Sequence, residues 1–117
     1  MYEIIPSPGT ENKEWSEIEK KIEQASPFAK TIHIDVIDGE FANNTTFSDP
    51  APFAKYTKDM LFEVHLMVKE PINYLKPFAD AGFQRFIGQI EHMSDQAEFV
   101  AQAQLLGEVA LALDKQT

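Results

Sequence analysis

The sequence contains no cysteine, which excludes disulfide bonds, thiolate metal sites, iron–sulfur clusters and thiol catalysis. It also has no long apolar run, since the stretch Val109–Leu113 is far shorter than the roughly 20 residues of a membrane helix. The start, Met1-Tyr2-Glu3, shows neither the basic region nor the apolar region of a signal peptide. We therefore predict a cytoplasmic protein with no membrane partner.

Basic residues are few: 10 Lys and Arg stand against 19 Asp and Glu, for a formal net charge of −9. This balance excludes electrostatic binding of nucleic acid. The five glycines are isolated from one another, so they form no glycine-rich phosphate loop. With 117 residues, 44% of them hydrophobic, the chain has the size and composition of one globular domain over residues 1–117.

Apolar periodicity predicts an alternation of strands and helices joined by short connections. Such an order is typical of an α/β fold with a parallel sheet. A long polar segment, residues 40–52, predicts a loop. The predicted strands are Tyr2–Pro6, Thr31–Ile37, Leu61–Val68, Arg85–Glu91 and Val109–Leu113; the predicted helices are Thr10–Ala25, Pro71–Ala81 and a segment capped by Ser94 and ended by Gly107, with 52–58 at best a short helix.

The three middle strands each combine an apolar face with a polar face. Ile32, Ile34 and Val36 alternate with His33 and Asp35. The next strand places Val64 and Leu66 on one face and Glu63, His65 and Met67 on the other, and the third has Gln89 on its polar face. A doubly wound sheet is apolar on both faces, whereas a (β/α) barrel carries its site on the inner face. The pattern favours the curvature of a barrel.

Three of these polar residues, His33, Asp35 and His65, come from adjacent strands and should point to the same side. Two imidazoles and one carboxylate form a common ligand set for zinc, iron(II) or manganese. Hydrogen-bonded core histidines beside a strand-end aspartate are the alternative. We expect no positive side chain there to pair with the acids, and both interpretations stay open at this point.

The same residues carry a resemblance to a known family. The stretch His33–Phe41, with Asn44, Thr46 and Phe47 after it, resembles the second-strand signature of ribulose-phosphate 3-epimerases. The run Glu63–Val68 followed by Pro71 resembles their third-strand signature, and Ile5-Pro6-Ser7 is similar to their first strand. The resemblance covers strands one to five and implies a ribulose-phosphate-binding (β/α) barrel, here reduced to a (βα)4-β half-barrel.

The resemblance also implies roles for individual residues. His33, Asp35 and His65 would be three of four ligands of a divalent metal (zinc, iron(II) or manganese), and Asp35 would also be one of two acid–base carboxylates. Ser7 would contact the sugar phosphate, and Met67, with His65, would lie against the substrate. The implied reaction interconverts ribulose 5-phosphate and xylulose 5-phosphate through proton transfer at C3, with the metal stabilising the enediolate.

The resemblance is incomplete, because a whole barrel usually needs about 200 residues or more. The fourth metal ligand, which is also the second acid–base Asp, and the phosphate loops have no counterpart in these 117 residues. Ile37 stands where the family usually has Met, and Gln89 where His is common. We expect two copies to associate as a homodimer or higher homo-oligomer, with the partner's His65 near the place of the missing acid. The alternatives are an impaired metal-dependent isomerase and a non-catalytic half-barrel that self-associates.

Overall fold

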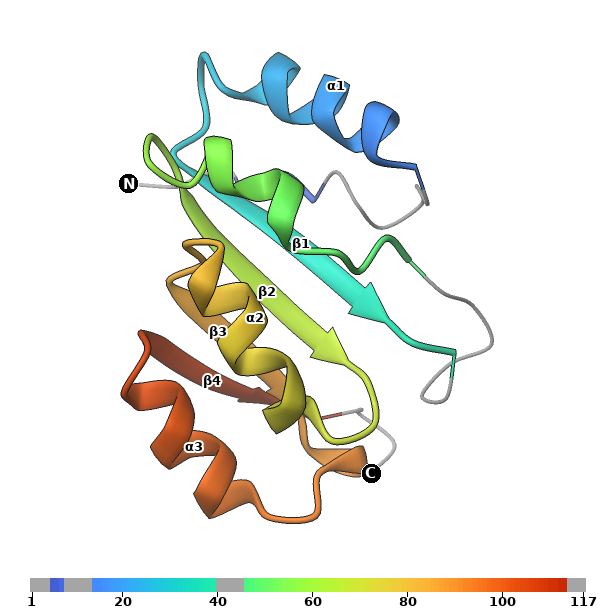
Figure 1. Cartoon of the computed structure of the whole chain (residues 1–117), viewed down its shortest axis with the longest axis vertical. Helices are drawn as coiled ribbons and strands as arrows, with labels where there is room; N and C mark the ends of the chain where they lie inside the picture. Colours follow the sequence, from blue (N-terminus) through green and yellow to red (C-terminus); the bar gives the residue numbers. More distant parts are fainter. Residues whose placement is uncertain (1–4, 8–13, 40–45, 114–117) are drawn as a thin grey trace.

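The computed structural model describes residues 5–7, 14–39 and 46–113. Four parallel strands form one sheet in the order β1-β2-β3-β4, with a helical segment between each consecutive pair (Figure 1). The predicted α/β fold with a parallel sheet is confirmed, and it corresponds to part of a (β/α) barrel. The strands are β1 (Thr31–Ile37), β2 (Leu61–Met67), β3 (Arg85–Gln89) and β4 (Glu108–Ala112), and the α-helices are α1 (Trp15–Ala25), α2 (Leu75–Asp80) and α3 (Gln96–Gln104).

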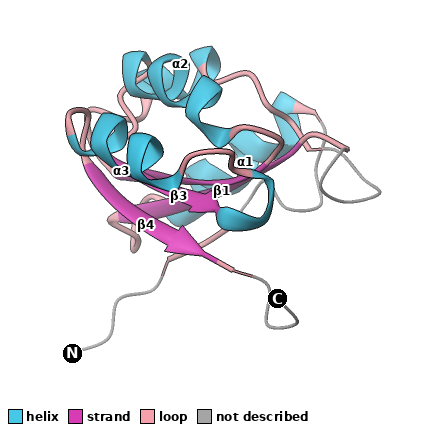
Figure 2. Ribbon diagram, turned by 90° about the horizontal axis from the view of Figure 1, so that it is seen from below, coloured by secondary structure: helices cyan, strands magenta, loops and turns pink. Residues whose placement is uncertain are grey.

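One face of the sheet is covered and the other carries the polar side chains. Along β1, Ile32, Ile34 and Val36 are fully buried, whereas His33 and Asp35 between them stay partly exposed. The covered face packs against all three α-helices, which lie on one side of the strands in the view of Figure 2. The alternation in the sequence therefore indicated correctly which side of the sheet is open to a ligand.

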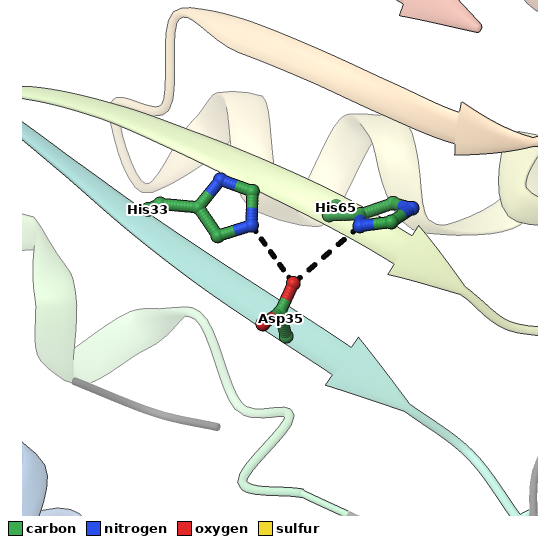
Figure 3. Close-up of side chains that lie close together, drawn as sticks. All are labelled: His33, Asp35 and His65. Carbon is green, nitrogen blue, oxygen red and sulfur yellow. Dashed lines mark hydrogen bonds and ion pairs between the residues drawn. The ribbon is translucent and has the colours of Figure 1, made fainter. Parts of the chain in front are cut away.

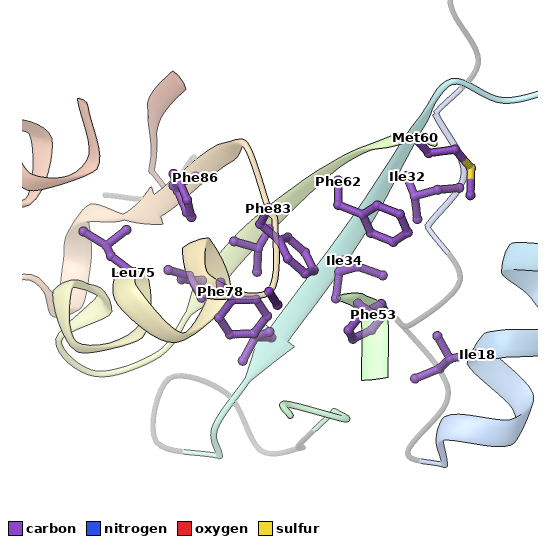
Figure 4. Close-up of a cluster of buried hydrophobic side chains, with 14 of the residues drawn as sticks. Ile18, Ile32, Ile34, Phe53, Met60, Phe62, Leu75, Phe78, Phe83 and Phe86 are labelled. Atoms are coloured by element: carbon purple, nitrogen blue, oxygen red, sulfur yellow. The ribbon is translucent and has the colours of Figure 1, made fainter. Parts of the chain in front are cut away.

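Aromatic side chains fill the space between the covered face and the helices. Phe53 comes from a 3₁₀ helix, η1 (Ala51–Lys55), and packs edge-on against Trp15, Phe62 and Phe83, with ring centroids 4.8 to 5.8 Å apart. Figure 4 shows Phe53, Phe62 and Phe83 in this cluster. Phe78 extends the cluster, with its centroid 4.9 Å from that of Phe83. Edge-to-face pairs at these distances add to the hydrophobic stabilisation of the core.

Several element boundaries differ from the predictions. Helix α1 begins at Trp15 and is preceded by Glu14 in extended conformation, so Thr10 is not its cap; Thr10 itself lies outside the described residues. Asp95, not Ser94, caps α3 by accepting a hydrogen bond from the Glu98 amide at 3.0 Å. Ser94 instead donates to Glu70, 2.8 Å away.

The predicted helix over 71–81 is divided in two. Pro71 opens a 3₁₀ helix, η2 (Pro71–Tyr74), and α2 starts only at Leu75. Pro77 has no N–H and cannot bond to the carbonyl four residues earlier, so a regular α-helix cannot run through the segment. Strand β3 ends at Gln89, earlier than predicted, and the 3₁₀ helix η3 (Ile90–His92) follows it directly.

Most of the first predicted strand lies outside the described residues. Its last residue, Pro6, has no strand conformation, but its carbonyl oxygen accepts a hydrogen bond of 2.9 Å from the His33 amide. Pro6 therefore lies beside the edge of β1 that does not pair with β2. The described residues contain no helix long and apolar enough to cross a membrane.

Candidate metal centre

The candidate site is built from two neighbouring strands whose register is in phase. In the parallel pairing of β1 with β2, His33 faces Glu63 and Asp35 faces His65. Because these residues have the same alternation, all four side chains project from the uncovered face. His33, Asp35 and His65 each direct one ligand atom to a common point, and these atoms lie within 4.8 Å of one another (Figure 3).

Asp35 lies between the two imidazoles. Its Oδ1 atom is 2.8 Å from His33 Nε2 and 3.5 Å from His65 Nδ1. The three side chains are only 14 to 21% exposed, so water does not fully screen the carboxylate. Two imidazole nitrogens and a carboxylate oxygen are suitable donors for a divalent ion, and their spacing is close to that around one ion with bonds of about 2.1 Å. The residues fit a metal.

A positive side chain does pair with an acid of this face, and this corrects the sequence-based expectation. Glu63 accepts hydrogen bonds from His33 Nδ1 at 2.5 Å and from Arg85 at 2.7 Å. Arg85 also donates through Nε to Glu108, 2.9 Å away. Arg85 has the same parity on β3 as Gln89, so the alternation could have placed it on this face; its reach to Glu63 follows from the register of β2 with β3.

A second polar chain supports His65. Its Nε2 atom lies 2.7 Å from Oε1 of Gln89, and Nε2 of Gln89 donates to Glu91 over 2.7 Å. Gln89 is 5% exposed, so it is a buried polar residue with both ends of its amide bonded. The two imidazoles are therefore each held from behind by a side chain on the next strand.

The carboxyl end of β1 is held by a hydroxyl group. Thr46 Oγ1 donates to the carbonyl of Asp35 at 2.8 Å and accepts from the amide of Ile37 at 3.0 Å. Nearby, Asp38 accepts a hydrogen bond from the Lys69 amide at 2.9 Å, which joins the ends of β1 and β2. These contacts fix the backbone that carries Asp35.

The two other candidate substrate-binding residues lie near this group. Met67 is half-buried on the same face of β2, two residues beyond His65. Ser7 is exposed and directly follows Pro6, whose carbonyl bonds to β1. Ile37 is buried at the end of the same face of β1. Their roles toward a substrate stay predictions.

The carboxylates around His33 alter its protonation. The hydrogen bond to Asp35 raises the pKa of His33 above its ordinary value; burial opposes this, and the bond to Glu63 adds to it. Burial alone would raise the pKa of Glu63, but the hydrogen bonds from His33 and Arg85 outweigh it and lower that pKa. His33 and Glu63 thus favour the charged pair in the metal-free chain.

These shifts predict a pH dependence of the metal-free fold. Because the folded-state pKa of His33 is raised, its stabilising contribution is complete below the ordinary value of 6.5 and is lost as the pH rises through the folded-state pKa. The contribution of Glu63 is complete above 4.5 and is lost in acid. Urea unfolding of the wild type and His33→Gln should therefore differ more at pH about 5.5 than at pH about 9. An equal difference at both pH values would contradict the shift of His33.

Comparison with known proteins identifies the family of this chain. The model of the ribulose-phosphate 3-epimerase family matches residues 7–117, which is nearly the whole chain. The chain belongs to the ribulose-phosphate 3-epimerase family. It is similar to the ribulose-phosphate 3-epimerase of Chlamydia pneumoniae, with 36% identity over 84 residues, 70% of this chain and 35% of the relative.

Two further relatives are eukaryotic. The ribulose-phosphate 3-epimerase, cytoplasmic isoform, of Oryza sativa subsp. japonica is 36% identical over 77 residues, 64% of this chain and 33% of the relative. The ribulose-phosphate 3-epimerase of Schizosaccharomyces pombe is 31% identical over 95 residues, 77% of this chain and 42% of the relative. The matched part of the chain thus spans 33 to 42% of the length of these curated relatives.

Proposed function

We propose that His33, Asp35 and His65 bind a divalent metal and that Asp35 transfers the C3 proton in the interconversion of ribulose 5-phosphate and xylulose 5-phosphate. The observation that carries the proposal is the convergence of these three side chains, within 4.8 Å, in a member of this epimerase family. When bound, a divalent ion would polarise the substrate oxygens beside the reacting carbon and stabilise the negative charge that develops there.

The chain's own residues would supply part of the remaining chemistry. Asp35 would remove the proton at C3 on one face of the substrate. Met67, two residues beyond His65 on the same face of β2, would exclude water from the reacting carbons, and Ser7 would bind the phosphate. Return of a proton on the opposite face needs a second acid, so epimerisation requires a group beyond these residues.

Solvent exchange tests this proposal more directly than turnover. The chain is incubated in D₂O with ribulose 5-phosphate and zinc, iron(II) or manganese, the sugar is separated from protein and metal, and its C3 proton is measured by NMR. We expect loss of the C3 proton signal with the configuration retained, because Asp35 can remove and return a proton on its own face. Exchange together with xylulose 5-phosphate would also support the proposal and would indicate that another copy supplies the second acid. A folded sample with no exchange under any metal would refute it.

A second candidate function, a self-associating half-barrel, is favoured by the exposed edge at β4. We propose that two copies of the 117-residue chain associate through this edge. Strand β4 pairs only with β3 within the described sheet, and an unpaired edge strand is a template for pairing with another chain. Light scattering at micromolar concentration should give twice the chain mass of 13.3 kDa, and a monomer mass would refute the association. The large apolar side chains exposed on β4 and beside its two ends include Leu106, Leu111 and Leu113.

A further inference from the structure

Each histidine of the candidate site has one nitrogen toward Asp35 and the other toward a polar side chain behind it. For His33 the outer nitrogen is Nδ1, 2.5 Å from Glu63 Oε2, and the inner one is Nε2. For His65 the outer nitrogen is Nε2, 2.7 Å from Gln89 Oε1, and the inner one is Nδ1. The rings therefore use different nitrogens toward the common point, and whether both can bind an ion depends on where their protons lie.

The partner behind His33 can only accept a hydrogen bond. An ionised carboxylate has no proton to donate, and the other oxygen of Glu63 already accepts from Arg85 at 2.7 Å. A proton on His33 Nδ1 is therefore favoured whenever Nε2 gives up its own. In the register, His33, Glu63, Arg85 and Glu108 form one row of facing residues across the four strands.

The partner behind His65 is an amide, whose orientation decides whether it accepts or donates. Gln89 Nε2 lies 2.7 Å from the carboxylate of Glu91, which can only accept. The amide oxygen must then face His65, so His65 Nε2 carries the proton and Nδ1 is left with a lone pair. The carboxylate of Glu91 thus determines, through the amide of Gln89, which nitrogen of His65 carries the proton.

We infer that Glu63 and Gln89 are positioning residues that hold the outer protons of His33 and His65, so that His33 Nε2 and His65 Nδ1 are both available to one divalent ion. The inference rests on the proposed metal site. Arg85 and Glu91 act one step further out, by fixing the orientation of Glu63 and Gln89. Such outer hydrogen bonds contribute about 10- to 100-fold to metal affinity.

Because Arg85 fixes the orientation of the side chain at position 63, a second substitution at Arg85 can test whether a loss of zinc affinity is restored. In Glu63→Gln the amide oxygen must accept from Arg85, which can only donate, so the amide NH₂ faces His33 Nδ1 and opposes a proton there. Zinc affinity, measured by competition with a chromogenic chelator, should fall about 10- to 100-fold. Adding Arg85→Met leaves the amide free to turn its oxygen to His33, so the double variant should bind zinc more tightly than Glu63→Gln alone.

Nitrogen NMR gives a readout independent of activity. In the zinc-loaded wild type, ¹⁵N-labelled His33 should show a protonated Nδ1 and His65 a protonated Nε2. Glu108→Gln is the matched control, because Glu108 is a carboxylate of the same row that bonds to Arg85 and to neither histidine of the site. This variant should change neither the zinc affinity nor the tautomers of His33 and His65. Gln89→Met removes the acceptor of His65 and should weaken zinc binding about as much as Glu63→Gln does.

The outcomes separate the inference from the proposed function. A wild type that binds no zinc would refute the metal site itself. Zinc binding by the wild type with equal affinity in Glu63→Gln would overturn the inference and leave the metal site standing. Weakened binding that Arg85→Met worsens would also overturn it, because a merely structural role predicts that the two losses add.

Discussion

Asp35→Asn is expected to lower the rate of C3 proton exchange of ribulose 5-phosphate in D₂O by about 10²- to 10⁴-fold. An amide is too weak a base to remove the proton. The substitution also removes the negative charge from the point where His33 and His65 converge. The change keeps the shape of a side chain whose Oδ1 is 2.8 Å from His33 Nε2. Zinc binding should weaken in the same variant, measured by chelator competition.

The control for this variant is Asp80→Asn. Asp80 is an exposed residue at the end of α2 that pairs with Lys76, four residues earlier. Its substitution by Asn makes the same change in net charge as Asp35→Asn, but away from the site. Its exchange rate and zinc affinity should equal those of the wild type. If zinc-bound Asp35→Asn exchanged the C3 proton at the wild-type rate, Asp35 could not be the base.

Phe53→Ala is expected to cost about 3–5 kcal/mol of unfolding free energy, measured by urea titration. Phe53 is 1% exposed, and its ring packs against Trp15, Phe47, Phe62 and Phe83, which come from α1, the segment after residue 45, β2 and the residues before β3. A cavity at this point removes packing contacts with four segments of the chain at once. Domains of this size have a total unfolding free energy of about 5–15 kcal/mol, so the variant should be near the limit of stability.

Phe28→Ala serves as the matched control for the core variant, because Phe28 is 64% exposed. Its unfolding free energy should change by less than about 0.5 kcal/mol. A loss below about 1 kcal/mol in Phe53→Ala would show that the cluster repacks around the deletion. Loss of packing at Phe53 should also reach the site, since Phe47 directly follows Thr46, whose hydroxyl bonds to the Asp35 carbonyl at 2.8 Å.

The arrangement of the sheet could be predicted from the sequence because alternation alone assigns side chains to faces. The parity of His33 and Asp35 on one strand and of His65 on the next was sufficient to place all three on the uncovered face. Parallel strands joined by one helical connection are usually neighbours, so their convergence followed without knowledge of distances. The periodicity of Ile18, Ile22 and Ala25 likewise identified the buried face of α1.

The supporting contacts of the site could not be predicted in the same way. Arg85 reaches Glu63 because β2 and β3 pair with these two residues opposite each other, and the sequence does not state that register. The hydroxyl of Thr46 reaches the carbonyl of Asp35, which lies 11 positions earlier in the sequence. The cap of α3 was misassigned by one residue, since Ser94 and Asp95 are both good caps and tertiary contact with Glu70 engages Ser94.

The in-phase register of the strands also indicates where new chemistry could be introduced. The row that contains Asp35 and His65 continues across the sheet to Ile87 on β3 and Ala110 on β4. Ile87 is half-buried and has the same parity as the polar residues of its strand. An acidic substitution there, Ile87→Asp, would place a carboxylate on β3 beside His65, on the opposite side of His65 from Asp35. A protein engineer could thus extend the polar row from β2 to β3 within a single copy of this chain.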